Sequence, residues 1–236
     1  MAALFVTAAA IIMSSDAWSA GAAYAVDTAE VSEAGSCKVE SWVSSAGNHD
    51  FLAAVSPACV MNFSRPVEVS VQLNRARAGE EWTTGATPKL KTSLVPSGIG
   101  TWGVALAAGA PFDLITRENT GAFAYVPATL RLSENARINL NGGWQWDRMA
   151  DRHYLLYGAG FDVRTSDNMW TLTGEVFGLA GIADAASVTQ PRFQLGLRFR
   201  PIDRFNIDLI YGRNLTGENA NWITLATIIR FPPPRK

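Results

Sequence analysis

The amino-acid pattern of residues 192–212, RFQLGLRFRPIDRFNIDLIYG, constrains the fold more than any other part of this chain. Large apolar side chains fall on almost every second residue, and Arg, Gln, Asn or Asp fills most of the positions between them. A period of two is typical of β-strands whose two faces meet different surroundings. The segment therefore predicts two consecutive strands, each with one apolar face and one charged face.

The same alternation recurs along the chain and predicts a fold made of strands. Past residue 25, no apolar run reaches the length of a membrane-spanning helix. We expect about twelve strands, within a range of roughly ten to fourteen. They are located at residues 37–44, 51–56, 66–74, 81–95, 99–109, 121–132, 137–147, 153–164, 169–178, 192–200, 205–212 and 221–231.

The predicted connections alternate between short and long. Residues 96–98, 133–136, 165–168 and 201–203 make short connections. Longer ones fall at residues 110–120, 148–152, 180–191 and 213–220. Outer-membrane barrels have this asymmetry, with tight turns on the periplasmic side and longer loops outside.

The apolar faces could cover either a soluble core or the hydrocarbon of a membrane. A β-sandwich or a lipocalin-like barrel would show a similar alternation. Three features favour the membrane: the polar faces carry many charges, a closed barrel leaves no unpaired edge in lipid, and aromatic residues gather at two levels. The expected outer level holds Trp144, Trp146, Tyr211 and Trp222, and the inner level holds Trp170, Phe205 and Phe231. We therefore predict an all-β fold, a closed antiparallel transmembrane β-barrel over residues 37–231.

Composition agrees with that prediction. Charged residues make up only 17% of the 236 residues, and the chain carries eight Trp and 20 Gly. The formal net charge of −1 offers no support for binding nucleic acid.

The N-terminal residues 1–25 are predicted to be a secretory signal peptide. An apolar run from Ala2 to Met13 precedes a small-residue cleavage site at Ala23-Tyr24-Ala25. The alternative is a buried N-terminal helix. If cleavage follows Ala25, residues 26–36 form a periplasmic segment before the barrel, and residues 232–236 form a tail after it.

The two cysteines, Cys37 and Cys59, lie beyond the expected cleavage site. In an oxidising compartment, one disulfide is the default expectation. Two free buried thiols are the alternative. With twelve strands, both residues fall at the periplasmic rim, as a disulfide requires. Because no His residues accompany the pair, we expect no metal site there.

With its alternating strands and its last strand ITLATIIRF, the chain resembles the small bacterial outer-membrane β-barrels and is loosely similar to the phenol-pathway transport barrels. In that superfamily, a final strand with alternate apolar residues and a terminal aromatic is the signal for the barrel assembly machinery. The resemblance implies this role for Ile223, Leu225, Ile229 and Phe231. The tail PPPRK after Phe231 departs from a strictly terminal aromatic.

Catalysis has weak support in the sequence. Outer-membrane lipases and lipid A deacylases use a His and Ser pair near the outer rim, and this chain has only His49 and His153. No Ser stands two residues after His153, so we interpret it as a rim residue bonded to water or lipid headgroups. Asp162, Glu175 and Asp208 share a face with many Arg and are interpreted as ion-pair partners. No cofactor is expected, since no phosphate-binding loop precedes a helical pattern.

The predicted lumen is positively charged. Its basic residues are expected to be Lys38, Lys89, Lys91, Arg131, Arg137, Arg164, Arg192, Arg198, Arg200 and Arg230. Its acidic residues are expected to be Glu40, Glu68, Asp147, Asp162, Glu175 and Asp208. These side chains would either form an ion-pair network that plugs the lumen or line a narrow channel that favours anions.

Three functions follow as hypotheses. The first is a passive channel or transporter for small solutes, anionic ones included, across the outer membrane. The second is a non-conducting structural or adhesion barrel, and the third is a lipid-modifying hydrolase. The expected partners are outer-membrane lipids, lipopolysaccharide, the barrel assembly machinery and a small-molecule solute.

Overall fold

The computed structural model describes residues 23–182, 189–216 and 220–233. Most of the predicted signal peptide, including its apolar run, lies outside the described residues. So do the last three residues of the predicted C-terminal tail.

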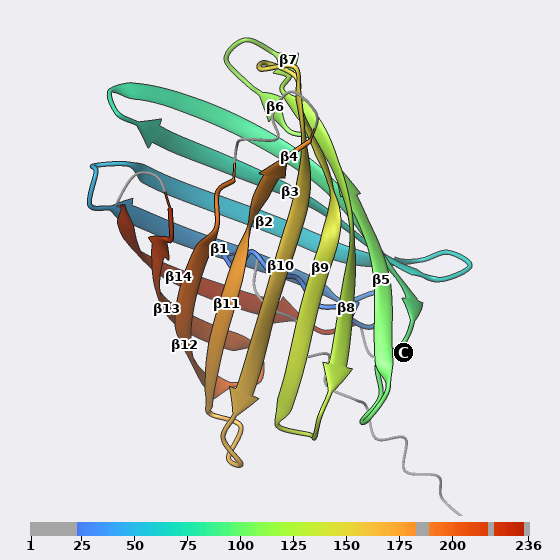
Figure 1. Ribbon diagram of the computed structural model, residues 1–236. Coiled ribbons are helices and arrows are strands. Elements are labelled where there is room, and N and C mark those ends of the chain that lie inside the picture. The colour runs from blue at the N-terminus through green and yellow to red at the C-terminus, as the bar shows by residue number, and fades with distance from the viewer. Residues whose placement is uncertain (1–22, 183–188, 217–219, 234–236) are drawn as a thin grey trace, which may run out of the picture.

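Twelve long strands form one closed antiparallel sheet, as predicted (Figure 1). They are β1 (Cys37–Ala46), β2 (Phe51–Asn62), β3 (Pro66–Ala78), β4 (Glu81–Val95), β5 (Trp102–Gly109), β8 (Gly121–Arg131), β9 (Ala136–Asp147), β10 (Arg152–Arg164), β11 (Trp170–Gly181), β12 (Arg192–Ile202), β13 (Phe205–Asn214) and β14 (Asn221–Phe231). Each pairs with its neighbours along the chain, and β1 closes the barrel against β14 in a register that sets Cys37 opposite Phe231.

Two short strands lie within the connection from β5 to β8. These are β6 (Phe112–Asp113) and β7 (Glu118–Asn119), which pair with each other, and β6 also pairs with β4. Together they fold this long connection against the barrel wall.

The strand boundaries differ from the predicted ones in two informative places. β5 begins at Trp102 rather than at residue 99, since Gly98 and Thr101 form an isolated bridge around Gly100, whose φ of 74° suits a tight turn. β2 continues beyond residue 56 through Pro57. The proline provides no N–H, yet its strand resumes the same register with β3 at Ala58 and Ser70.

The alternation sorts the side chains as the sequence predicts. Leu195 and Leu197 are 48% and 45% exposed on the outer surface, whereas Arg198 is only 4% exposed in the interior. The same holds for β14, where Leu225 is exposed and Thr224 is buried. The outer wall is therefore apolar and the lumen polar. Among the described residues, no helix is long and apolar enough to cross a membrane.

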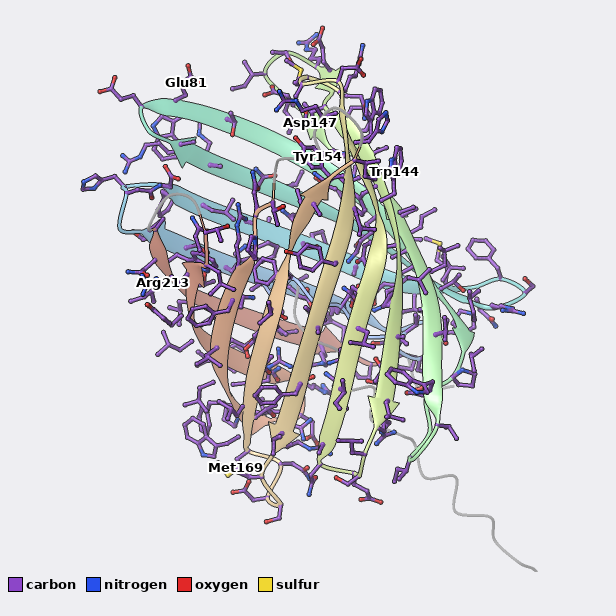
Figure 2. The ribbon with its side chains drawn as sticks, viewed as in Figure 1. Glu81, Trp144, Asp147, Tyr154, Met169 and Arg213 are labelled. Carbon is purple, nitrogen blue, oxygen red and sulfur yellow. A yellow bond between two sulfur atoms is a disulfide. The ribbon has the colours of Figure 1, made fainter. Side chains whose placement is uncertain are left out.

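The two ends of the barrel differ. The rim with the longer connections, called the outer rim here, includes Glu81 and Asp147, and the rim with the short turns, called the inner rim, includes Met169 (Figure 2). Aromatic side chains pack near both rims: the rings of Trp170 and Phe199 lie 4.6 Å apart, and those of Trp144 and His153 lie 5.6 Å apart.

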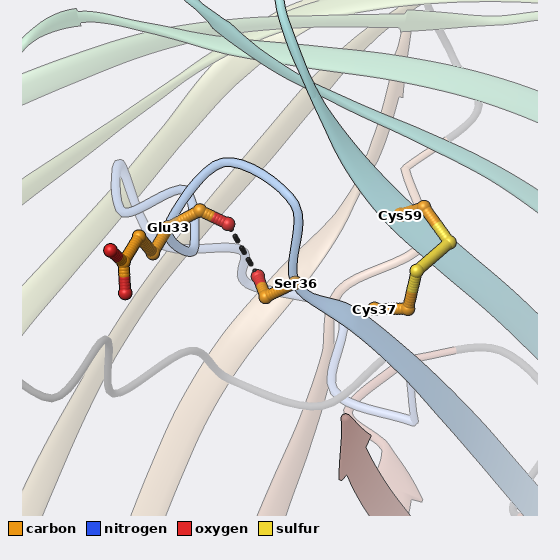
Figure 3. The surroundings of a disulfide bond; sticks show 4 residues. All are labelled: Glu33, Ser36, Cys37 and Cys59. Atoms are coloured by element: carbon orange, nitrogen blue, oxygen red, sulfur yellow. Dashed lines mark hydrogen bonds between the residues drawn. A yellow bond between two sulfur atoms is a disulfide. The ribbon is translucent and has the colours of Figure 1, made fainter. Parts of the chain in front are cut away.

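Cys37 and Cys59 form the predicted disulfide at the inner rim (Figure 3). They face each other in the register of β1 and β2. Just before Cys37, the Ser36 hydroxyl donates a hydrogen bond of 2.5 Å to the carbonyl of Glu33. The disulfide and this turn fix the point at which the chain enters the barrel wall.

We predict that replacing both cysteines by serine lowers the stability of the barrel without preventing its assembly. The 22-residue separation closes a loop that contributes about 3 kcal/mol on the chain-entropy model. The strand pairing of β1 with β2 and β14 remains. The temperature at which the folded band disappears in a heat-modifiability gel measures the effect. An unchanged transition, with the wild-type disulfide verified by mass spectrometry, would contradict the prediction.

Candidate functional site: the barrel lumen

The segment Ala23–Glu33, called the plug here, lies largely inside the barrel, and its first three residues, 23–25, belong to the predicted signal peptide. Val26, Thr28 and Ala29 are 2%, 0% and 1% exposed. The expected periplasmic position of residues 26–36 is therefore wrong for the residues up to Glu30, because their backbone and side chains are bound by the lumen wall. Only the end of that range, near Ser36, lies at the inner rim.

The first plug residues rest on β10, β11 and β12. The N–H groups of Ala25 and Val26 donate to the two carboxylate oxygens of Glu175 at 2.7 and 3.1 Å. A Cβ added to Gly158 would lie 2.8 Å from the Val26 side chain, so the absence of a side chain at this position makes the close approach possible. The sequence predicts that Glu175 is an ion-pair partner. Its carboxylate instead accepts hydrogen bonds from these two backbone N–H groups and from the side-chain amide of Gln194, at 2.5 Å.

Tyr24 is also buried, against β12. Its side chain is 6% exposed and lies against Gly196, where an added Cβ would come within 2.1 Å of the hydroxyl. The guanidinium of Arg198 lies 5.6 Å from the centre of the Tyr24 ring. This contact holds the start of the plug on the β12 side of the lumen.

Asp27 forms the centre of the plug. Its carboxylate lies 2.7 Å from Lys91 Nζ and 3.5 Å from Lys89 Nζ, and the hydroxyl of Tyr125 donates to it at 2.9 Å. With its amide oriented to satisfy both groups, Asn141 accepts from the Asp27 N–H at 2.8 Å and donates to its carbonyl at 2.9 Å. Burial alone would raise the pKa of Asp27, but Lys91 and Lys89 hold that pKa well below its usual range. The carboxylate is therefore ionised at neutral pH.

Glu30 joins the plug to a second group of charges. Arg137 lies between two carboxylates, at 2.7 Å from Glu30 and 2.7 Å from Asp162. Asp162 also accepts hydrogen bonds from Asn139 at 2.9 Å and from Thr173 at 2.6 Å. Because the wall residues of this network are buried and the Glu30 side chain is only 12% exposed, the network fixes the plug to β9, β10 and β11.

Two further groups of ion-paired side chains lie on the lumen side of the wall. Arg198 and Asp208 are directly opposite each other on β12 and β13, with Nε and Oδ1 2.6 Å apart. Lys38 lies 3.3 Å from both Glu40 and Glu68. The structure thus gathers part of the predicted lumen set into four ion-pair groups: Lys38, Glu40, Glu68, Lys89, Lys91, Arg137, Asp162, Arg198 and Asp208.

The remaining predicted arginines lie toward the rims. Arg164 donates to the Glu134 carbonyl at 3.1 Å, Arg200 to the Asn168 carbonyl at 3.2 Å, and Arg230 to the Asn206 side chain at 2.9 Å. Arg131 ends β8 at the inner rim, and Arg192 begins β12 at the outer rim. Asp147 accepts from the N–H groups of Met149 and Ala150 and so shapes the β9–β10 turn.

A cavity lies on each side of the plug. The outer cavity measures about 610 Å³ and its lining includes Asp27, Lys38, Lys89, Tyr125 and Trp146. The inner cavity measures about 320 Å³ and opens at the inner rim. Its charged lining residues are Glu33, Lys38, Arg164, Arg198, Arg200, Asp203, Arg204 and Arg230. Lys38 lines both cavities, so it marks the level at which they approach each other.

Sequence reasoning missed the plug and hence Asp27 and Glu30 as lumen residues. One signal points to them: the predicted wall has more basic than acidic residues, and buried cations need counter-charges. Asp27 and Glu30, which precede the first strand by a few residues, carry carboxylates that could supply these counter-charges. Their segment is too short to show any strand period.

The structure gives no arrangement that suggests catalysis at the histidines. The indole N–H of Trp144 donates to Nδ1 of His153 at 3.2 Å on the outer surface. His49 lies in the β1–β2 turn with a φ of 70°, and its carbonyl accepts from Arg77. Among the described residues, no three His, Cys, Asp or Glu side chains gather as a metal site would require.

Solved structures share this fold at low sequence identity. The KdgM porin aligns with a TM-score of 0.61 at 10% identity, covering 83% of this chain and 99% of that one. The NanC porin gives 0.65 at 8% identity, covering 81% and 98%. The COG4313 outer membrane channel from Pseudomonas putida F1 gives 0.60 at 12% identity, covering 85% and 97%. These neighbours are porins and channels rather than enzymes, and they show that the fold is that of a small outer-membrane barrel.

The other comparisons concern sequence. A family model described as "Uncharacterised conserved protein UCP029691" matches residues 8–231. No curated protein matches the sequence significantly.

Proposed function

The chain belongs to the family described as uncharacterised conserved protein UCP029691, and we propose that it is a passive outer-membrane channel for small, anionic solutes. The observation that carries this proposal is the charge of the inner cavity. Lys38 and Arg198 line it with their charges balanced by Glu40, Glu68 and Asp208 of the wall. Four more arginines, at positions 164, 200, 204 and 230, line it against the two carboxylates of Glu33 and Asp203. Such an excess of fixed positive charge raises the local concentration of anions and excludes cations.

The outer cavity provides room for a solute rather than an excess of positive charge. Its lining contains Lys38 and Lys89 together with Asp27, Glu40, Glu68 and Asp147, and at about 610 Å³ it is large enough for a small organic solute. A structural neighbour, the KdgM porin, has been solved in complex with disordered oligogalacturonate, which carries a carboxylate on each sugar. That ligand class is a reasonable one to test here.

The proposal places the barrel in the outer membrane, with lipids, lipopolysaccharide and the barrel assembly machinery as partners. Arg75 and Arg77 lie on the outer surface at the outer rim, 5.0 and 5.5 Å from the ring centre of Trp82. Arginines beside an aromatic ring at this level suit the phosphates of lipopolysaccharide. Ile223, Leu225, Ile229 and Phe231 are exposed on one face of β14, as an assembly signal requires.

We expect the channel to prefer anions, and we expect Arg200→Gln with Arg230→Gln to reduce that preference by roughly twofold. The two side chains are part of the inner cavity lining, so their loss lowers the positive potential there. The reversal potential across a planar bilayer in a KCl gradient gives the permeability ratio. The matched control is Arg77→Gln with Arg213→Gln, which removes the same charge from the outer-rim side. Equal shifts in both variants, or a cation preference in the wild type, would refute the assignment.

The second candidate function is a non-conducting structural barrel. The observation that favours it is the plug, which crosses the lumen and binds three groups of wall residues. A structural barrel would stay closed under every condition, whereas a channel must open when its plug contacts are weakened. Conductance measured before and after weakening these contacts therefore separates the two functions.

A further inference from the structure

Asp27 occupies a site that has the chemistry of a carboxylate receptor. The two ammonium groups of Lys89 and Lys91 and the hydroxyl of Tyr125 converge on its two oxygens at 3.5, 2.7 and 2.9 Å. The three residues come from β4 and β8, so the rigid barrel wall holds them in place. Asp27 comes from the plug, which belongs to none of these strands. Wall and occupant are therefore separable parts.

The Asp27 site faces the outer cavity. Asp27, Lys89 and Tyr125 all line that cavity, while Lys91 lies behind them with a side chain only 2% exposed. The Lys89 side chain is 26% exposed. An anion that enters from the outer rim therefore meets Lys89 first, and it reaches Lys91 only where the Asp27 carboxylate lies.

On this basis, and on the proposed channel function, we propose that Lys89, Lys91 and Tyr125 bind the carboxylate of a solute. Asp27 fills this site when no solute is present, and a carboxylate-bearing solute competes with Asp27 for it. The solute class is a small organic acid, acidic sugars included. When the solute carboxylate displaces Asp27, the centre of the plug is released from the wall.

A solute carboxylate can compete with Asp27 at concentrations on the order of millimolar. A group held on a short tether competes with an effective concentration on the order of millimolar. The plug is tethered through residues 31–36 to the disulfide-fixed start of β1, and its centre is ten residues from Cys37. A solute with several carboxylates has a further advantage, because Arg137 also holds a plug carboxylate, that of Glu30, at 2.7 Å.

The test is calorimetric titration of galacturonate into detergent-folded protein, with galactose as the uncharged probe. In Asp27→Asn, the amide no longer competes for the lysines, and we expect galacturonate to bind about tenfold tighter than in wild type. Galactose should show no such gain. Glu81→Gln, which removes an exposed outer-rim carboxylate, is the matched control and should behave as wild type.

A second variant tests the wall residues. Adding Lys91→Gln to the Asp27→Asn background should abolish most of the gain, since one of the two ammonium groups is lost while no buried carboxylate is left unpaired. If galacturonate binds equally well to wild type, Asp27→Asn and the double variant, the carboxylate site does not exist. A weaker affinity in Asp27→Asn than in wild type leads to the same conclusion.

The outcomes separate this site from the channel function. Anion-selective conductance in bilayers without any effect of Asp27→Asn on galacturonate binding overturns the site and leaves the channel. Tighter galacturonate binding by Asp27→Asn in a barrel that never conducts overturns the channel and leaves the site.

Discussion

Deletion of residues 26–33 is expected to raise the single-channel conductance by at least about threefold, since it removes the obstruction between the two cavities. The deleted residues include the buried Val26, Thr28 and Ala29 and the carboxylates of Asp27 and Glu30. These deleted residues take no part in the strand pairing that closes the barrel. Planar bilayer recordings under identical salt conditions provide the measurement, and a heat-modifiability gel checks that the deletion variant is folded.

A crosslinked variant checks the same prediction in the opposite direction. An ideal Cβ at Gly160 would lie 3.6 Å from the Cβ of Val26, a separation that suits a disulfide. The variant Val26→Cys with Gly160→Cys should therefore conduct poorly when oxidised and recover on reduction. Gly160→Cys alone, given the same reductant, controls for the native disulfide. If neither deletion nor reduction changes conductance, the plug does not limit the pore.

Arg198→Met is expected to destabilise the barrel by about 3–5 kcal/mol, because it leaves the buried carboxylate of Asp208 without its partner. The two side chains are 4% and 1% exposed and are joined by hydrogen bonds at 2.6 and 3.3 Å. Unfolding in urea or guanidinium, followed by gel mobility of the lipid-reconstituted barrel, measures the loss.

The double variant Arg198→Met with Asp208→Leu distinguishes an unpaired charge from lost packing. Removing both charges should recover most of the stability, since an apolar pair of similar volume often replaces a buried ion pair without cost. Met169→Leu at the inner rim is a substitution of similar size outside the ion pairs and should be nearly neutral. A double variant as unstable as Arg198→Met would show that packing around the guanidinium, including its contact with Tyr24, accounts for the loss.

The strands and the faces of the wall could be predicted from the sequence to within a few residues. Leu195 and Leu197 point outward and Arg198 inward because each strand has only two faces, and one must meet a medium without hydrogen-bonding groups. Counting the strands predicts that Cys37 and Cys59 lie at one rim, and they form a disulfide there. The second strand extends to Asn62, beyond the predicted end at residue 56, because pairing with β1 and β3 continues on both sides of Pro57.

The sequence by itself determined the barrel: a period of two, sustained through twelve strands, specifies which side chains face outward and which face the lumen. Only the tertiary structure decided what fills the lumen. The Asp27 contacts with Lys89, Lys91 and Tyr125 join residues up to 98 positions apart. A segment without regular structure leaves no periodic trace, and its position depends on charges and close approaches that exist only once the wall has closed.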